Sequence, residues 1–426
     1  MLDIRFIREH ATQVRRGAQR KGFGQVDIDR LLQVDADLRR AKQGLQEIAT
    51  RKNKAGEQIS KLSGQEKQEA IEEISQLKAQ EKEYRERLDE FEPIYEELML
   101  QVPQVPAAEV PDGADDTENV EIRRWGQLPE FDFEPSDHVQ LGKNLDIIDI
   151  ERGVKLAGSR SYFLKGDGAL LELAVLRFAL DYMVNECGFV AMIPPVLVRD
   201  EAMVGTAWFP GGEDQAYRMD RDQLNLAGTA EVPLTAYHSG EILAEEDLPL
   251  RYVAWSPCYR REAGTYGKDT HGLYRIHQFQ KIEQVIVCKN DEQESIEHHQ
   301  RILANSEAVV QALELPYRVV NVCAGDLGRG QVQKFDIECW MPSRKNYGET
   351  HSASRYHEFQ ARRLNLRYRG SDKKTRFCHT LNNTVIASPR ILISILECNQ
   401  NADGSVTIPQ VLRPYMNGRE RIEIKK

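Results

Sequence analysis

Five side chains between residues 260 and 283 have types that suit a charged ligand with a flat ring. Arg260 and Glu262 are two residues apart, and Arg275, Phe279 and Glu283 follow one another at even steps, so each set shares one face of any regular strand. Guanidinium groups pair with phosphate oxygens, a phenyl ring offers a stacking surface, and a carboxylate can hold an ammonium group. The spacing alone favours a second interpretation, a half-exposed antiparallel sheet whose charges pair across strands.

The segment that carries these side chains is predicted as a strand, a loop and a second strand. A polar, glycine-rich loop follows Gly264 and ends at Gly272. A fully extended run from Arg275 to Glu283 would cover about 26 Å, so either the second strand curves or its first residues belong to a loop that folds over a ligand.

The elements that must position this segment belong to a mixed domain over residues 127–426. A helix is expected at 169–184, and strand-like runs occur at 252–256, 284–288, 318–323 and 335–340. In the last run, Phe335, Ile337 and Cys339 alternate with two carboxylates, which predicts one apolar and one acidic face. The sequence shows no βαβ rhythm, GxGxxG or GxxxxGK[ST], which disfavours a Rossmann or P-loop nucleotide site.

The first hundred residues predict a helical hairpin that projects as an arm, at about 36–98. Apolar residues recur at steps of three and four along 38–62 and 74–98, and Ser63 and Gly64 between them suggest a turn. The first helix is rich in cations, among them Arg39, Arg40, Lys42, Arg51, Lys54 and Lys61. Taken alone, such a hairpin is more typical of a dimerising coiled coil than of an RNA-binding arm. Residues 101–126, rich in proline and acidic side chains, are expected to be a linker.

The composition excludes several classes of protein. The net charge of −10 over 426 residues argues against a chain covered in basic surface, although a local basic face remains compatible with nucleic acid. The first ten residues mix charges of both signs and the apolar stretches are interrupted, so neither a signal peptide nor a membrane span is expected. The seven cysteines form no CxxC pair, so we expect reduced thiols in a cytoplasmic protein and no structural zinc.

The run Tyr259-Arg260-Arg261-Glu262-Ala263-Gly264 resembles motif 2 of the class II aminoacyl-tRNA synthetases, and its details are similar to the seryl-tRNA synthetases. The resemblance extends along the chain through Met1-Leu2-Asp3-Ile4-Arg5, residues 119–126, Gly158-Ser159-Arg160, residues 162–166 and Phe359-Gln360-Ala361-Arg362-Arg363. It implies an α+β fold in which a coiled-coil arm precedes an antiparallel sheet flanked by helices. It also implies a homodimer, with Pro194-Pro195 in the motif 1 region of the interface, although a loop pinned by proline fits these residues equally well.

The resemblance assigns roles to the motif 2 residues. It implies that Arg260 contacts the α-phosphate and the serine carboxylate, that Arg261 and Glu262 bind ATP, with Glu262 helping to place adenine, and that Arg275 contacts the γ-phosphate. Phe279 matches the ring that stacks on adenine, and Glu283 matches the acid that receives the polar groups of serine. Thr229-Ala230-Glu231 matches the serine-binding TxE motif, where a helix N-cap with an acidic first turn is locally just as plausible.

Two later segments complete the implied site. Glu349-Thr350-His351-Ser352 occupies the place of Glu-x-Ser-Ser, in which Glu349 and Ser352 would help to hold Mg²⁺ and the phosphates of ATP, and His351 replaces the usual first serine. Ser354-Arg355-Tyr356-His357-Glu358 also departs from the common Ser-Asn-Cys-x-Asp. Residues 380–390 match motif 3, with Arg390 as its arginine and Thr384 where the family often has a serine that touches the substrate. A helix is expected to follow at 391–396.

The implied reaction is the ligation of L-serine to tRNA(Ser), with Arg260 and Arg390 as the catalytic residues. The serine carboxylate attacks the α-phosphorus of ATP, and the seryl group then passes from the adenylate to the 3′-terminal ribose, a reaction of positioning and electrostatics. Charging of tRNA(Sec) is left open. In this context the basic side of the arm, Arg39, Arg40, Lys42, Arg51 and Lys54, becomes a tRNA-binding surface. The alternatives are a paralogue that loads a carrier protein, which would lack the arm, or one that binds RNA without catalysis, which would have lost site residues.

Overall fold

The computed structural model describes residues 1–59, 62–264 and 272–424, and the predicted arm cation Lys61 and loop residues 265–271 lie outside them. The chain divides into two compact units, one formed by Met1–Gln19 and Phe23–Pro103 and the other by Arg20–Gly22 and Gln104–Lys426. Among the described residues, no helix combines the length and the apolar character needed to cross a membrane.

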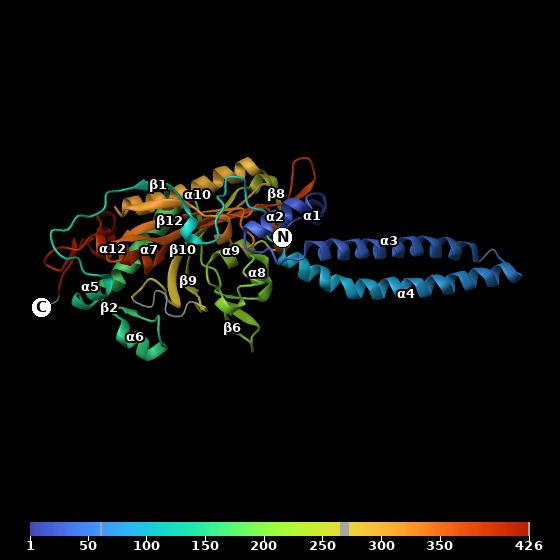
Figure 1. Cartoon of the computed structure of the whole chain (residues 1–426), viewed down its shortest axis with the longest axis horizontal. Coiled ribbons are helices and arrows are strands. Elements are labelled where there is room, and N and C mark those ends of the chain that lie inside the picture. The colour runs from blue at the N-terminus through green and yellow to red at the C-terminus, as the bar shows by residue number, and fades with distance from the viewer. Residues whose placement is uncertain (60–61, 265–271, 425–426) are drawn as a thin grey trace. The chain divides into compact units, whose positions relative to one another are not determined.

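The first unit contains the predicted helical hairpin. After α1 (Ile4–Glu9) and α2 (Ala11–Arg20), the long helices α3 (Ile28–Ile59) and α4 (Gly64–Gln101) run side by side (Figure 1). Leu38, Ile48 and Leu77 from the two predicted apolar repeats are buried. Gly44 lies so close to the ring of Tyr84 that an added Cβ atom would approach it to 2.5 Å. The coiled-coil arm predicted from the repeats is therefore confirmed.

The second unit is built on an eight-stranded sheet in the order β1-β11-β12-β13-β16-β10-β9-β4. Its neighbouring strands are antiparallel, apart from β4 and β9, which are parallel. Along the chain the strands are β1 (Val120–Trp125), β4 (Val190–Met192), β9 (Leu250–Tyr259), β10 (Gln278–Cys288), β11 (Tyr317–Asn321), β12 (Gln333–Met341), β13 (Asn346–Arg355) and β16 (His379–Ser388). This arrangement confirms the predicted α+β class.

Helices pack their apolar residues against this sheet. The principal ones are α7 (Asp167–Asn185), α10 (Glu292–Ala312) and α12 (Arg390–Cys398), which share one apolar core with β10, β12 and β16. As predicted, Phe335, Ile337 and Cys339 of β12 belong to this core.

The smaller helices include α5 (His138–Asn144), α6 (Ile150–Ala157), α8 (Asp200–Gly205), α9 (Glu231–Ala236) and α11 (Phe359–Leu364). The short strands β2 (Ile148–Asp149) and β3 (Phe163–Leu164) pair with each other, and β5 (Leu197–Val198), β6 (Tyr217–Met219) and β7 (Leu224–Leu226) form a small sheet. Another small sheet joins β8 (Ile242–Ala244), β14 (Arg367–Arg369) and β15 (Thr375–Phe377), and β17 (Val406–Thr407) pairs with β18 (Arg421–Ile422).

The segment expected to be a linker takes part in the second unit. The amide of Gln104 donates to the carbonyl of Arg329 at 2.9 Å, and residues 120–125 form β1 at the edge of the large sheet. The partner strand of β1 is β11, with Val120 opposite Asn321. Most β1 side chains are exposed, so the run lacks the alternation of apolar and polar residues that marks a half-buried strand.

Candidate active site

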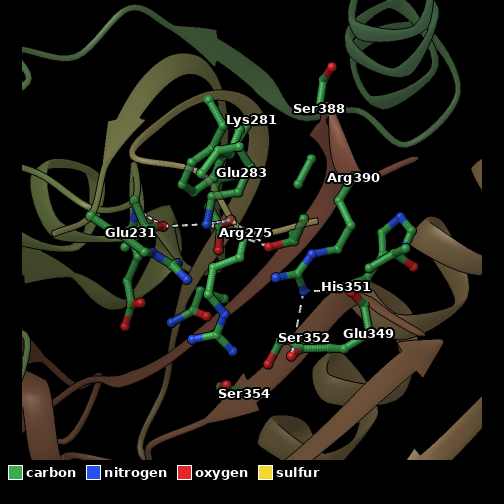
Figure 2. A pocket seen from close by; sticks show the side chains of 18 of the residues that line it. Glu231, Arg275, Lys281, Glu283, Glu349, His351, Ser352, Ser354, Ser388 and Arg390 are labelled. Atoms are coloured by element: carbon green, nitrogen blue, oxygen red, sulfur yellow. Dashed lines mark hydrogen bonds and ion pairs between the residues drawn. The ribbon is translucent and has the colours of Figure 1, made fainter. Parts of the chain in front are cut away.

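A cavity of about 170 Å³ lies over β10, β13 and β16. Most of the residues predicted for the site line it: Thr229, Glu231, Arg260, Glu262, Arg275, Phe279, Glu283, Glu349, Thr350, His351, Ser352, Thr384 and Arg390. Figure 2 shows that Glu231, Arg275, Glu349 and Arg390 point toward the same space although they come from different segments. Arg261 and Ala230 do not line the cavity, since the Arg261 guanidinium donates to the carbonyl of Asp214 and Ala230 is buried before α9.

The motif 2 residues lie in the connection between two strands rather than on one strand face. β9 ends at Tyr259 and β10 begins at Gln278. Arg260 and Glu262 therefore follow β9, and Arg275 precedes β10. An Arg275 nitrogen lies 3.0 Å from a Glu262 oxygen, which ties the two arms of the connection together. Of the two interpretations of the run from Arg275 to Glu283, a curved strand or a loop followed by a strand, the second is therefore right, because the residues before Gln278 belong to a loop.

Arg260 is held over the aromatic wall of the cavity. Its Nε donates to the carbonyl of Gly228 at 3.3 Å, and its guanidinium carbon lies 5.3 Å from the centre of the Phe279 ring. The ring of Trp208, a residue that sequence reasoning missed, lies 5.8 Å from the same carbon. A cation between two rings is oriented without losing its charge, and it can still meet an anion within the cavity.

A buried cation lies between the residues expected to bind serine. Lys281, which the sequence analysis did not select, has its Nζ 2.7 Å from Oε2 of Glu283 and donates to Oγ1 of Thr229 at 2.6 Å. The hydroxyl of Thr384 donates to the same Glu283 oxygen at 3.2 Å. Lys281 stands at an even step between Phe279 and Glu283, so the alternation that selected those two residues also contained the signal for Lys281.

Glu231 lies beside this cluster and is buried. The side-chain amide of Gln360 donates to its Oε1 at 2.8 Å. Burial and the neighbouring Glu283 raise the pKa of Glu231 to about 7, which is far above the ordinary value for glutamate. Its carboxyl group therefore changes charge near neutral pH, and a cationic group in the cavity would favour the ionised form.

The opposite side of the cavity combines Glu349 with Arg390. The Arg390 guanidinium donates to the carbonyl of Glu349 at 2.6 Å, to that of Tyr274 at 3.1 Å, and lies 3.7 Å from the Glu349 carboxylate. Partial desolvation in the cavity works to raise the pKa of Glu349, but Arg390, Lys334 and other cations hold this pKa below the ordinary value. Although Glu349 is held ionised, its side chain is 49% exposed, so the carboxylate can reach a ligand.

Glu349 and Ser352 form an oxygen donor set that suits Mg²⁺. Both residues line the cavity from β13. Magnesium prefers hard oxygen ligands, uses one or two protein carboxylates and takes its other ligands from water and phosphate. A carboxylate kept ionised next to a hydroxyl, with space for phosphate beside it, therefore fits the predicted metal site.

His351 and Thr350 hold each other inside the strand. The register of β12 and β13 shifts between Ile337 and Glu338, which leaves Thr350 as the extra residue of a β-bulge. Oγ1 of Thr350 lies 2.7 Å from Nδ1 of His351. Burial lowers the pKa of His351 to about 3, so the imidazole is neutral at ordinary pH and acts as a packing and hydrogen-bonding group.

The predicted tRNA-binding cations lie on exposed positions of α3. Arg39 pairs with Asp35, Arg40 with Asp37, Lys42 with Glu92 and Arg51 with Glu73, and Lys54 is exposed. The pairs of Lys42 and Arg51 join exposed side chains, and such pairs are worth about 0–1 kcal/mol each, so a phosphate can compete for these two cations. Asp35, the partner of Arg39, is buried.

Comparisons with known proteins identify the class first. The family described as "tRNA synthetase class II core domain (G, H, P, S and T)" matches residues 216–399, which contain the cavity residues from Thr229 to Arg390. The family described as "Seryl-tRNA synthetase N-terminal domain" matches residues 1–106. The second unit is thus the core of a class II aminoacyl-tRNA synthetase.

Relatives along the full chain then define the family. A serine–tRNA ligase of Deinococcus radiodurans is 46% identical over 99% of this chain and 98% of its own length, and that of Geotalea uraniireducens is 42% identical over 99% and 100%. The seryl-tRNA synthetase of Pyrococcus horikoshii, solved in complex with ATP, superimposes with a TM-score of 0.95 at 37% identity, with 100% of both chains covered. The cytoplasmic serine–tRNA ligase of Naegleria fowleri, solved with AMP, gives 0.89 at 31% identity over 100% of this chain and 99% of that one. The chain belongs to the seryl-tRNA synthetase family, and it is an ATP-dependent enzyme that ligates serine to tRNA.

Proposed function

We propose that the cavity over β10, β13 and β16 binds ATP and L-serine side by side and joins them as seryl-adenylate. The observation that carries this proposal is the grouping of charges along the cavity wall. In one region Arg390, Arg260 and Arg275 lie near enough to Glu349 to lower its pKa. In the other, the buried acids Glu231 and Glu283 are neighbours. A triphosphate matches the first region, and an amino acid with an ammonium group matches the second.

The arginines are proposed to hold the nucleotide. Arg260 lies over Phe279, so a guanidinium on the α-phosphate and a ring under adenine can act together. Glu262, paired with Arg275, helps to place the base, and Arg275 and Arg390 receive the outer phosphates. Three cations around the phosphates stabilise the charge that develops on the pentavalent phosphorus.

The acids are proposed to select serine. Glu231 receives the ammonium group, and Glu283 and Thr384 receive the hydroxyl group, since their side chains already share a hydrogen bond. Lys281 supports this assignment, because it compensates the charge of Glu283 and also binds Thr229 of the TxE motif. A pocket that offers buried polar partners to a hydroxyl rejects a substrate without one.

Mg²⁺ would be held by Glu349 and Ser352 together with the phosphates of ATP. When bound, it would neutralise phosphate charge and orient the leaving pyrophosphate. The protein's own contribution is the ionised Glu349 carboxylate, which Arg390 and Lys334 keep deprotonated by lowering its pKa.

The chemistry needs no nucleophile from the protein. An oxygen of the serine carboxylate attacks the α-phosphorus, and the bond to the bridging oxygen of pyrophosphate breaks. A hydroxyl of the 3′-terminal ribose of the tRNA then attacks the seryl carbonyl and AMP leaves. The site contributes alignment and fixed charge, and His351, neutral at ordinary pH, does not act as a general acid.

The cations of α3 are proposed to bind the backbone of tRNA(Ser). Arg39, Arg40, Lys42, Arg51 and Lys54 lie within 16 positions of one helix, and the exposed pairs of Lys42 and Arg51 are weak enough for phosphates to displace. Whether the same surface also binds tRNA(Sec) is left open. The alternatives, a carrier-protein ligase or an inactive RNA-binding paralogue, are not favoured by full-length relatives that are serine–tRNA ligases.

A homodimer is proposed from the surface beside β4. Ile193 is 96% exposed and Val190 is also exposed, although both are large apolar residues in or directly after β4. β4 is the last strand in the order of the large sheet. An apolar surface next to an open sheet edge suits a second copy of the chain, in agreement with the predicted motif 1 interface. The seven free cysteines support a cytoplasmic location, where thiols stay reduced.

The function is tested by ATP–pyrophosphate exchange with each amino acid in turn. We expect serine alone to drive strong exchange, with alanine reduced by roughly 10⁴-fold or more because the hydroxyl partners are then left unpaired. Threonine is the stricter competitor, since it keeps the hydroxyl and is excluded by shape alone. Exchange with alanine equal to that with serine would overturn the assignment of the pocket.

A further inference from the structure

A buried pair formed by His138 and Glu397 lies beside the cavity, and neither residue lines it. His138 is the first residue of α5, and Glu397 lies in the last turn of α12. Nδ1 of His138 is 2.7 Å from Oε1 of Glu397, and the backbone amide of His138 donates to the same oxygen at 3.0 Å. An ionised carboxylate can only accept hydrogen bonds, so Nδ1 is the donor.

The other ring nitrogen of His138, Nε2, accepts a hydrogen bond from the backbone of Leu273, shortly after residues 265–271. The amide of Leu273 donates to Nε2 at 3.1 Å, so the imidazole is the neutral tautomer with its proton on Nδ1. Gly272 has a φ of +73°, and a Cβ atom there would lie 2.0 Å from Nε2. Only glycine fits this approach, so the ring fixes both the position and the direction of the backbone at this point.

The next residue connects this contact to the proposed ATP site. The carbonyl of Tyr274 accepts from Nε of Arg390 at 3.1 Å, and its ring centre lies 4.3 Å from the Arg390 guanidinium carbon and 4.1 Å from that of Arg344. Glu397 also accepts from the amide and from the hydroxyl of Ser343, both at 2.9 Å, immediately before Arg344. One buried carboxylate therefore holds Ser343 directly and Leu273 through His138, the residues next to Arg344 and Tyr274, and Tyr274 in turn contacts Arg390.

We propose that His138 and Glu397 are positioning residues for ATP activation, which act by holding Leu273 and Ser343 so that Tyr274 keeps Arg390 in place. The inference rests on the proposed contact between Arg390 and the phosphates. It predicts that the acceptor on Nε2, and not only the packing of the ring, determines how well ATP is bound.

Two substitutions separate the functions of the ring nitrogens. His138→Asn places an amide at the distance of Nδ1, so it keeps a donor for Glu397 but has no acceptor for Leu273. His138→Gln reaches the position of Nε2 and can accept from the Leu273 amide. In serine-dependent ATP–pyrophosphate exchange, we expect His138→Asn to raise the KM for ATP about tenfold and His138→Gln to raise it by less than about threefold. The KM for serine should change little in both.

Hydrogen–deuterium exchange gives a readout that does not depend on activity. The Leu273 amide should exchange faster in His138→Asn than in His138→Gln, because only the second variant supplies an acceptor. The matched control is His238→Asn, since Nδ1 of His238 also lies 2.7 Å from a carboxylate, that of Glu241, but its partners Glu241 and Tyr252 do not line the cavity, whereas Leu273, the partner of His138, does. This control should leave the KM for ATP unchanged.

The proposal is overturned if the Asn and Gln variants shift the KM for ATP equally, or if His138→Asn alters neither this KM nor the exchange of Leu273. If the His138 variants fail to fold, Ser343→Ala tests the same network from an exposed position, with an expected rise of about threefold in the KM for ATP. An unchanged KM in that variant also overturns it. Arg390→Ala is assayed in parallel. Normal ATP–pyrophosphate exchange in this variant would contradict the proposed role of Arg390 itself. If exchange is lost in Arg390→Ala but the KM for ATP is unchanged in the His138 variants, only the positioning inference is contradicted.

Discussion

The buried ammonium group of Lys281 permits a quantitative test of the serine pocket. Lys281 is 4% exposed and Glu283 is 2% exposed, with 2.7 Å between Nζ and the carboxylate. Lys281→Met keeps the length of the side chain but removes its charge, so Glu283 must stay ionised without its cation or take up a proton. Neutralising an ordinary glutamate of pKa about 4.3 at pH 7 costs about 3.7 kcal/mol, and breaking one partner of a buried pair costs about 3–5 kcal/mol. We therefore expect the free energy of unfolding to fall by about 3–4 kcal/mol at pH 7.

The measurement is urea-induced unfolding at two pH values, with serine-dependent exchange followed in parallel. At pH 5 the cost of protonating an ordinary glutamate falls to about 1 kcal/mol, so the difference between wild type and Lys281→Met should shrink by more than half. The matched control is the double variant Lys281→Met/Glu283→Gln, in which no charge is left unpaired. This double variant should recover much of the lost stability and none of the exchange activity.

Two results would refute this reasoning. If Lys281→Met lost less than about 1 kcal/mol at both pH values, the pair would not be buried as the distances and exposures indicate. If the double variant were no more stable than the single one, the loss would come from packing of the lysine chain and not from the unpaired carboxylate.

Three further predictions concern the rest of the machinery. Arg260→Ala and Arg390→Ala should each reduce exchange by about tenfold to a hundredfold while circular dichroism stays native, since each loses a charge-assisted contact of about 1.5–3 kcal/mol; near-normal exchange in both would exclude them from the mechanism. Because the raised pKa of Glu231, about 7, leaves its carboxyl group protonated below that pH, the KM for serine should rise up to about tenfold per pH unit below 7 and level off above it. Glu231→Gln should abolish this dependence, and an unchanged pH profile would separate Glu231 from the serine ammonium group. Replacement of residues 36–98 by a short Gly/Ser link should leave ATP–pyrophosphate exchange intact but weaken tRNA binding and flatten the salt dependence of that binding. A changed subunit count by native mass, with unaltered tRNA affinity and salt slope, would show that the arm serves dimerisation only.

Much of the fold follows from local patterns in the sequence. The apolar repeats predicted α3 and α4 because a long helix pair shows its seam in steps of three and four. β12 was equally clear, since its two faces have different polarity. β1 was not predicted, because an exposed edge strand has no such contrast and its pairing with β11 depends on residues almost 200 positions away.

The site was predicted unevenly for a related reason. The motif residues Arg260 and Arg390, which the family pattern marks, line the cavity, but Arg261, in the same motif as Arg260, does not and donates to the carbonyl of Asp214. Lys281 was missed although it shares the alternation of Phe279 and Glu283, because a lysine in a strand is usually solvated and the alternation does not show that this one is buried between Glu283 and Thr229. His138 gives no local signal at all, because its two partners come from distant parts of the chain.

The order of the large sheet has a consequence for how this enzyme is made. β16 lies between β13 and β10, although it is formed by residues 379–388, near the end of the chain, and α12 with Arg390 follows directly. Until the ribosome has released these residues, β10 and β13 each keep an edge without its partner strand, and such edges favour misassociation. Closure of the sheet and arrival of the motif 3 arginine therefore depend on the same segment, so a chain interrupted before residue 379 lacks both the strand that joins β10 to β13 and Arg390.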